Sequence, residues 1–150
     1  MLQNKLINLP HLGDQTLYHY ASVLQLAGLL ISYGFEEIHI NHNQDVDISV
    51  KINGETIAWE YERYNNKNLD IIVLKKAFAI EKYDKVWFVC SSTDEKYISK
   101  AVGEDSTLPR GAAVSEMLNA YKKVENLGTQ EQETSKIEPG LATSEPIAAL

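Results

Sequence analysis

Hydrophobic and polar residues alternate through the middle of the chain. The segments EEIHIN, DVDISVKI and TIAWEYER, within 36–63, place apolar residues at every second position, which is typical of strands with one buried face. Asn53 and Gly54 separate the last two segments, and this dipeptide is a strong signal for a tight hairpin turn. The pattern predicts a three-stranded antiparallel meander.

A helical pattern precedes this meander. Asp14 is placed to cap a helix and Gly34 to close it in the left-handed conformation. Between them, apolar residues recur three and four positions apart and predict a wide core-facing stripe. Its members are Leu17, Ala21, Leu24, Ala27 and Ile31, with Val23, Leu26 and Leu30 beside them.

A second helix is predicted over 67–83, capped by Asn65 or Asn66. Apolar residues form two sides of it, so we expect it to be covered on both. One side is Leu69, Val73, Ala77 and Ile80, and the other is Ile71, Leu74 and Phe78. Asn68, Lys75 and Lys82, spaced by seven, form a narrow polar stripe.

The continuous apolar run KVWFVC at 85–90 predicts a central strand buried on both faces. A short helix from about Asp94, a loop with Pro109 and Gly111, and a last helix over 114–123 should follow. A strand, a helix and a further strand favour a right-handed crossover with parallel pairing. The sequence therefore predicts an α/β domain, with a mixed sheet flanked by helices.

The chain of 150 residues suits one domain. We place that domain at 1–124, because 125–150 is rich in Glu, Ser, Thr, Gln, Gly and Pro without a hydrophobic period. The segment 125–150 is expected to be a disordered acidic tail or a linker.

Charge and cysteine content exclude several classes of function. The net charge of −7 disfavours broad nonspecific coating of nucleic acid, and the single Cys90 leaves no disulfide framework. His39 and His42 flank a predicted turn without further zinc ligands nearby, which disfavours a zinc site. The longest apolar run is about half the ~20 residues of a membrane span, and no signal-peptide pattern opens the chain, so we expect a soluble, cytoplasmic protein.

Three carboxylates are predicted to converge on the polar face of the meander. With Asn53 and Gly54 in the turn, Asp47 comes level with or diagonal to Glu60, and Glu62 points the same way. Two unit charges ~4 Å apart repel by about 4 kcal/mol near a protein surface, so a cation or proton should neutralise them. Mg²⁺ or Mn²⁺ suits Asp47, Glu60 and the Tyr61 carbonyl. The alternative is that these acids are solvated residues on an outward face.

The segments DVDISV and IAWEYE resemble the core of the PD-(D/E)XK nuclease superfamily. That resemblance implies a restriction-endonuclease-like α-β-β-β-α-β core, in which Asp47 matches the aspartate of the second strand and Glu60 the acid of the third. Asp45 fits the aspartate position less well. Glu62 stands where the family has lysine, although some restriction enzymes carry glutamate there. The lysine's electrostatic role would then pass to Lys75 or Lys67.

A closer likeness is to the nuclease-like half of replication-relaxation proteins of mobile elements. TLYHYASVLQLAGLL and WEYER carry it, over about 14–90. It implies DNA as a partner, with other replication or transfer proteins of a plasmid, phage or conjugative element. The winged-helix half of such proteins is absent from this sequence.

Two functions follow from these expectations. The first is a nuclease or DNA-processing accessory protein that uses Mg²⁺ or Mn²⁺ at Asp47, Glu60 and Glu62. The second is a catalytically inactive protein of the same fold, acting as an interaction or assembly module and forming a homodimer through the second helix. Tyr61 and Tyr64 could stack on bases, but core packing is the favoured interpretation.

Overall fold

The structure is a computed structural model that describes residues 17–41 and 45–128. Its elements are α2 (Leu17–Ser32), β1 (His39–Ile40), β2 (Ile48–Ile52), β3 (Glu55–Tyr61), α3 (Leu69–Lys82), β4 (Lys85–Cys90), α4 (Glu95–Val102), a 3-10 turn (Glu104–Ser106) and β5 (Thr107–Pro109), followed by helical residues 112–128. The strands form one sheet in the order β1-β2-β3-β4-β5. β1, β2 and β3 are antiparallel, whereas β3, β4 and β5 are parallel. The expected α/β class and mixed sheet are confirmed.

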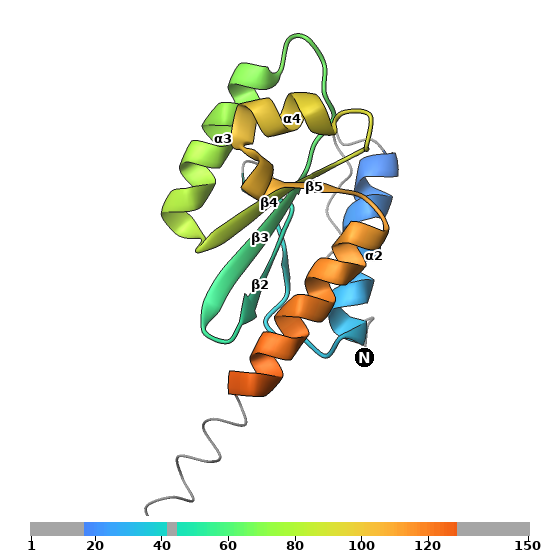
Figure 1. The fold of residues 1–150 in the computed structure, drawn as a ribbon, viewed down its shortest axis with the longest axis vertical. Helices are drawn as coiled ribbons and strands as arrows, with labels where there is room; N and C mark the ends of the chain where they lie inside the picture. Colours follow the sequence, from blue (N-terminus) through green and yellow to red (C-terminus); the bar gives the residue numbers. More distant parts are fainter. Residues whose placement is uncertain (1–16, 42–44, 129–150) are drawn as a thin grey trace, which may run out of the picture.

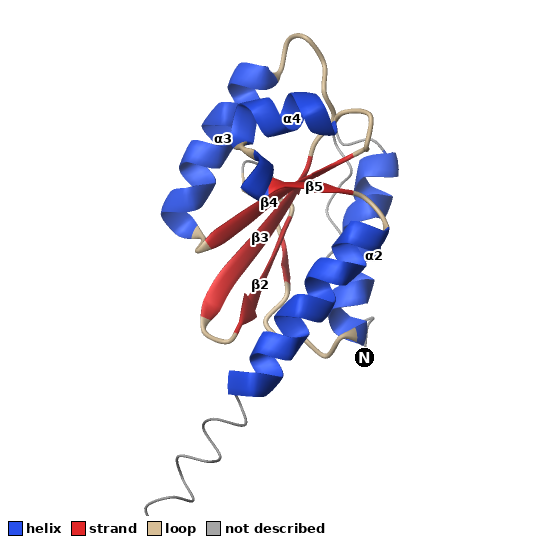
Figure 2. Ribbon diagram, viewed as in Figure 1, coloured by secondary structure: helices blue, strands red, loops and turns tan. Residues whose placement is uncertain are grey.

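Helices cover both faces of the sheet (Figures 1 and 2). α2 and the helical residues 112–128 lie on one face, where they bury a core made of Val23, Leu26, Leu30, Ile48, Val50, Ile57, Trp59, Val89, Val114 and Leu118 among others. α3 and α4 lie on the opposite face over a second core that includes Ala58, Ile72, Ala79, Val86, Phe88, Ile98 and Val102. The sheet therefore separates two cores.

The hairpin between β2 and β3 has the predicted turn. Asn53 and Gly54 both have positive φ, 52° and 84°, as a type I′ turn requires. The turn sets a register that pairs Ile48 with Trp59 and Val50 with Ile57. These apolar residues belong to the core beneath α2, and the predicted division of the hairpin into an apolar and a polar face is confirmed.

α2 ends as predicted but packs differently. Gly34 has φ 82°, its N–H donates to Ile31 O (2.9 Å), and the Phe35 N–H donates to Leu30 O (3.1 Å), which is a Schellman ending. The central line of the predicted apolar stripe was wrong. Leu17 and Ala21 were expected to face the core but are exposed, and the buried residues are Tyr20, Val23, Leu26, Ala27 and Leu30. Apolar residues surround so much of this helix that their spacing did not locate its buried line. Asp14, the expected cap, lies outside the described residues.

α3 begins later and is less covered than expected. Asn68 is its N-cap residue, while the Asn65 side chain instead accepts a hydrogen bond from the Lys67 N–H (2.8 Å) in the preceding turn. Only Ile72 and Ala79 are buried on α3, so the prediction of two covered sides was wrong. The large apolar side chains left exposed on it are Ile71, Val73, Leu74, Phe78 and Ile80. One helix resting on a sheet buries a single line of its residues.

The strand β5 was not predicted. Thr107–Pro109 pairs in parallel with β4 where a loop was expected. Pro109 is tolerated because β5 is the edge strand, whose outer side needs no ladder hydrogen bond. The last helix is longer than predicted and includes 125–128, the first residues assigned to the tail. The rest of that segment lies outside the described residues.

Two further features of the described residues bear on the sequence predictions. Cys90 is a free, buried cysteine. Across 17–41 and 45–128, no helix is both long enough and apolar enough to cross a membrane.

Candidate functional site: a buried carboxylate cluster

Three acidic side chains are buried near the carboxyl end of β3. Glu60 lies in β3, Glu62 directly follows that strand, and Asp47 directly precedes β2. Since Ile48 pairs with Trp59, the register brings Asp47 beside Glu60. The exposed fractions are 6% for Asp47, 6% for Glu60 and 7% for Glu62, which contradicts the alternative of solvated surface acids.

Asp47 and Glu60 are held by reciprocal hydrogen bonds. The Asp47 N–H donates to Glu60 Oε2 (3.0 Å), and the Tyr61 N–H donates to Asp47 Oδ2 (2.7 Å). Each acid therefore binds the backbone of the other strand, beyond the point where the β2–β3 ladder ends. This arrangement fixes the distance between the two carboxylates and leaves their charges to be balanced by other groups.

Lys75 supplies a positive charge from α3. Its ammonium lies 3.1 Å from Glu60 Oε1 and also contacts Glu62 Oε1. The predicted polar stripe of α3 thus faces the carboxylates, and the next lysine along it, Lys82, pairs with Asp45. Of the two lysines considered from the sequence, Lys75 is therefore the one that contacts the carboxylates.

The electrostatic balance of the cluster shifts two pKa values strongly. Burial, reinforced by the charges of Asp47 and Glu62 and opposed by Lys75, raises the pKa of Glu60 to about 8. Burial opposes the charge of Lys75, but Glu60 and Glu62 outweigh it and raise the pKa of that ammonium. Glu60 is consequently able to hold or release a proton near neutral pH, while Lys75 stays protonated.

His19 of α2 also belongs to the cluster, and the sequence interpretation missed it. Its Nε2 lies 3.0 Å from Asp47 Oδ1, and this hydrogen bond, against the effect of burial, raises the pKa of the imidazole. The imidazole also lies edge-on to the Tyr61 ring, with centroids 6.5 Å apart. The only signal in the sequence was a histidine in the first turn of a helix, and no spacing rule connects that turn to β2.

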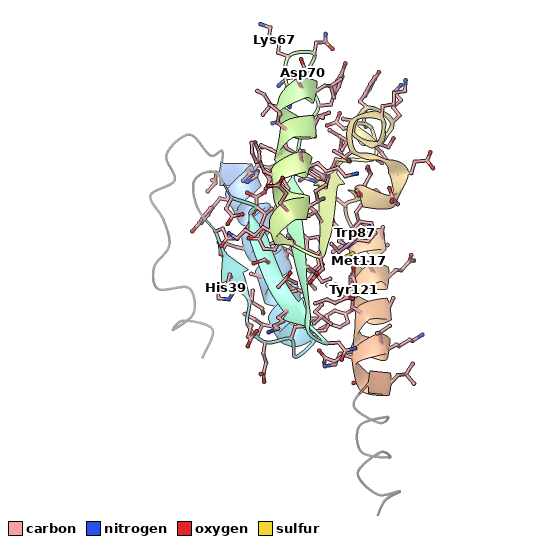
Figure 3. The ribbon with its side chains drawn as sticks, turned by 90° about the vertical axis from the view of Figure 1, so that its left-hand side faces the viewer. His39, Lys67, Asp70, Trp87, Met117 and Tyr121 are labelled. Carbon is pink, nitrogen blue, oxygen red and sulfur yellow. The ribbon has the colours of Figure 1, made fainter. Side chains whose placement is uncertain are left out.

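Of the other proposed residues, Lys67 and Tyr64 do not contact the acids, and Tyr61 reaches them through its backbone N–H. Lys67 is exposed before α3, and Figure 3 shows its side chain pointing outward from that end of the helix. Tyr61 packs in the core beneath α2, and Tyr64 stacks on Tyr97 with ring centroids 4.0 Å apart. The favoured interpretation of these tyrosines as packing residues is confirmed.

The donor set can be tested against the expected Mg²⁺ or Mn²⁺. Within the described residues, no three His, Cys, Asp or Glu side chains are arranged to hold a metal ion together. Asp47 and Glu60 nevertheless offer hard oxygen donors whose second lone pairs remain available beside their hydrogen bonds. Mg²⁺ is commonly held by one or two carboxylates with water and substrate oxygens, and Asp47 and Glu60 match that donor type.

Comparison with protein-family models, with curated proteins and with solved structures found no match for this chain. The geometry of the carboxylate cluster (Asp47, Glu60, Glu62, Lys75 and His19) is therefore the feature that indicates a function for this protein.

Proposed function

We propose that the protein is a metal-dependent nuclease, or a DNA-processing accessory protein of a mobile element, built on a restriction-endonuclease-like fold. The observation that carries the proposal is the joint burial of Asp47, Glu60 and Glu62, with the Lys75 ammonium on the two glutamates and His19 on Asp47. Buried groups with perturbed pKa values at the carboxyl ends of parallel strands are typical of functional sites. The resemblance of WEYER to replication-relaxation proteins supports the connection to mobile elements.

Each side chain of the cluster has a role in this proposal. Asp47 and Glu60 would hold a divalent cation, which supplies a bound water of lowered pKa and charge stabilisation for a phosphoryl group. Lys75 stabilises negative charge that develops on the phosphate, and Glu62 orients that ammonium. His19 fixes Asp47 through its hydrogen bond to Oδ1, so that Oδ2 stays on the Tyr61 N–H.

A cleavage assay tests this function. Single- and double-stranded DNA would be incubated with the protein and millimolar Mg²⁺ or Mn²⁺, and Glu60→Gln and Lys75→Met should each abolish cleavage. Lys67→Met is the matched control and should cleave as the parent does. Manganese should also raise the melting temperature of the parent but not of Glu60→Gln. No cleavage by the parent together with no manganese shift would refute the proposal.

The exposed face of α3 favours a second candidate, a non-catalytic assembly module. Ile71, Leu74 and Phe78 are 54%, 56% and 70% exposed and form one continuous strip on α3. A second copy could cover this strip about a two-fold axis, so that each copy buries the same residues. Light scattering at tens of micromolar should then give a dimer for the parent and a monomer for Phe78→Glu. A monomeric parent would exclude this function.

A further inference from the structure

Arg110 lies at the same end of the sheet as the carboxylate cluster, where the parallel strands β3, β4 and β5 terminate. It directly follows β5, and its N–H donates to Cys90 O (3.0 Å) at the end of β4. Its guanidinium carbon lies 4.8 Å from the centroid of the Tyr18 ring and 5.3 Å from that of Tyr61. Two aromatic rings from different elements therefore hold this cation in a defined position.

The guanidinium has few hydrogen-bond partners for its degree of burial. In the described part of the chain, its one side-chain hydrogen bond runs from Nη1 to Ser22 Oγ (3.3 Å). Nε is buried without a partner, and no carboxylate of those residues forms an ion pair with it. A guanidinium offers five N–H donors and is charged at every physiological pH. A partly buried cation with unused donors is a place where an anion would be favoured.

We propose that Arg110 binds a phosphate of a nucleic-acid strand and that Tyr18 stacks on an unpaired base of the same strand. The planar fork of arginine matches the oxygens of a phosphate. Tyr18 is 62% exposed, and an exposed aromatic ring beside a cation is the usual platform for single-stranded nucleic acid. This inference rests on the proposed nuclease function, to which it adds the single-stranded class of substrate.

Tyr61 connects this binding site to the carboxylate cluster. Its ring lies under Arg110, while its backbone N–H donates to Asp47 Oδ2 (2.7 Å). His19, hydrogen-bonded to Asp47, also contacts the Tyr61 ring edge-on. A strand held by Arg110 and Tyr18 would therefore be connected to Asp47 through a single residue, Tyr61. Lys75 approaches the acids from α3, on the other face of the sheet.

Fluorescence anisotropy with labelled oligonucleotides tests the inference independently of catalysis. The binding is measured in EDTA with the full chain, for single-stranded and double-stranded DNA. Arg110→Met and Tyr18→Ala should each weaken single-strand binding by about tenfold or more, because each removes a charge-assisted hydrogen bond or a stacked base. Arg110→Met should also reduce the slope of the logarithm of the binding constant against the logarithm of the salt concentration by about one. Lys85→Met is the control, since Lys85 lies over Trp87 (4.3 Å) at the opposite end of β4.

The outcomes separate this inference from the nuclease proposal. Strand binding that depends on Arg110, with no cleavage by the parent and no manganese shift of its melting temperature, would support the binding site and refute the nuclease. Equal binding by the parent and Tyr18→Ala, no binding by the parent, or equal competition by polyglutamate would overturn the inference. Thermal melts identify variants that do not fold, and Tyr18→Ala provides the decisive comparison if Arg110→Met is among them, because its ring is mostly exposed.

Discussion

The two faces of the β2–β3 hairpin are buried almost equally but are held together differently. Beneath α2, Ile48 and Trp59 are fully buried in the apolar core. On the other face, Asp47, Glu60 and Glu62 are 6–7% exposed. Their negative charges are compensated by His19, Lys75 and backbone N–H groups. Burial of charge costs free energy unless it is compensated. The first face therefore stabilises the fold, and the second face maintains a site.

The largest effect should come from the apolar face. Trp59→Ala is expected to lower the free energy of unfolding by about 4 kcal/mol, because it removes a fully buried indole from a packed core. Urea denaturation followed by circular dichroism measures this loss. Trp59→Phe is the matched control and should cost much less, since it keeps most of the volume and removes an indole N–H that is buried without a partner.

If Trp59→Ala destabilised the protein no more than Lys75→Met, the two faces would contribute alike, and the distinction between a stabilising face and a functional face would be lost.

The next largest effect should come from the charged face. Lys75→Met is expected to cost about 2 kcal/mol near pH 8, since it leaves two buried glutamates without their cation. This value is below the usual cost for fully buried pairs because the Lys75 side chain is 43% exposed. Urea denaturation measures the cost, and Lys67→Met should cost nothing measurable. Adding Glu60→Gln to Lys75→Met should recover part of the loss.

These two faces also differ in how far the sequence predicted them. Strict alternation and the Asn53–Gly54 turn fixed the register, so Ile48, Trp59, Asp47 and Glu60 were all assigned correctly. Lys75 was one of two candidate lysines, because helical spacing placed it on a polar stripe but could not orient that stripe. His19 and Arg110 reach the site from elements far apart in the chain, and no local pattern encodes such contacts. The same limit applies to β5 and to the outer face of α3.

Stability should fall with rising pH because of the charged face. The pKa of Glu60 is raised from 4.5 to about 8 in the folded state, so its contribution is fully present below pH 4.5 and is lost as the pH rises through about 8. The pKa of His19 is also raised, so its contribution is present below 6.5 and is lost above that value. Melting temperatures from pH 4.5 to 8.5 should decrease by several degrees in the parent.

Two variants separate the contributions of Glu60 and His19 to this pH dependence. Glu60→Gln keeps the shape of the side chain and should remove the decrease between pH 4.5 and 6.5, whereas His19→Gln should remove only part of the decrease above pH 6.5. Asp47, Glu62 and Lys75 face both groups and are unchanged in these variants. A parent whose melting temperature is flat or rises over this range would contradict the assigned burial of Glu60.

The smallest effect on stability should come from a third surface, the outer face of α3. Phe78 is 70% exposed, so Phe78→Ser should change the free energy of unfolding of the isolated chain by no more than about 0.5 kcal/mol. Measured across protein concentration, the parent should become more stable as concentration rises if a second copy covers the strip, and Phe78→Ser should not. Identical concentration dependence in the two proteins would leave the strip without a role in assembly. The apolar residues of α3 would then resemble neither face of the hairpin, because they would contribute neither to the core nor to a site.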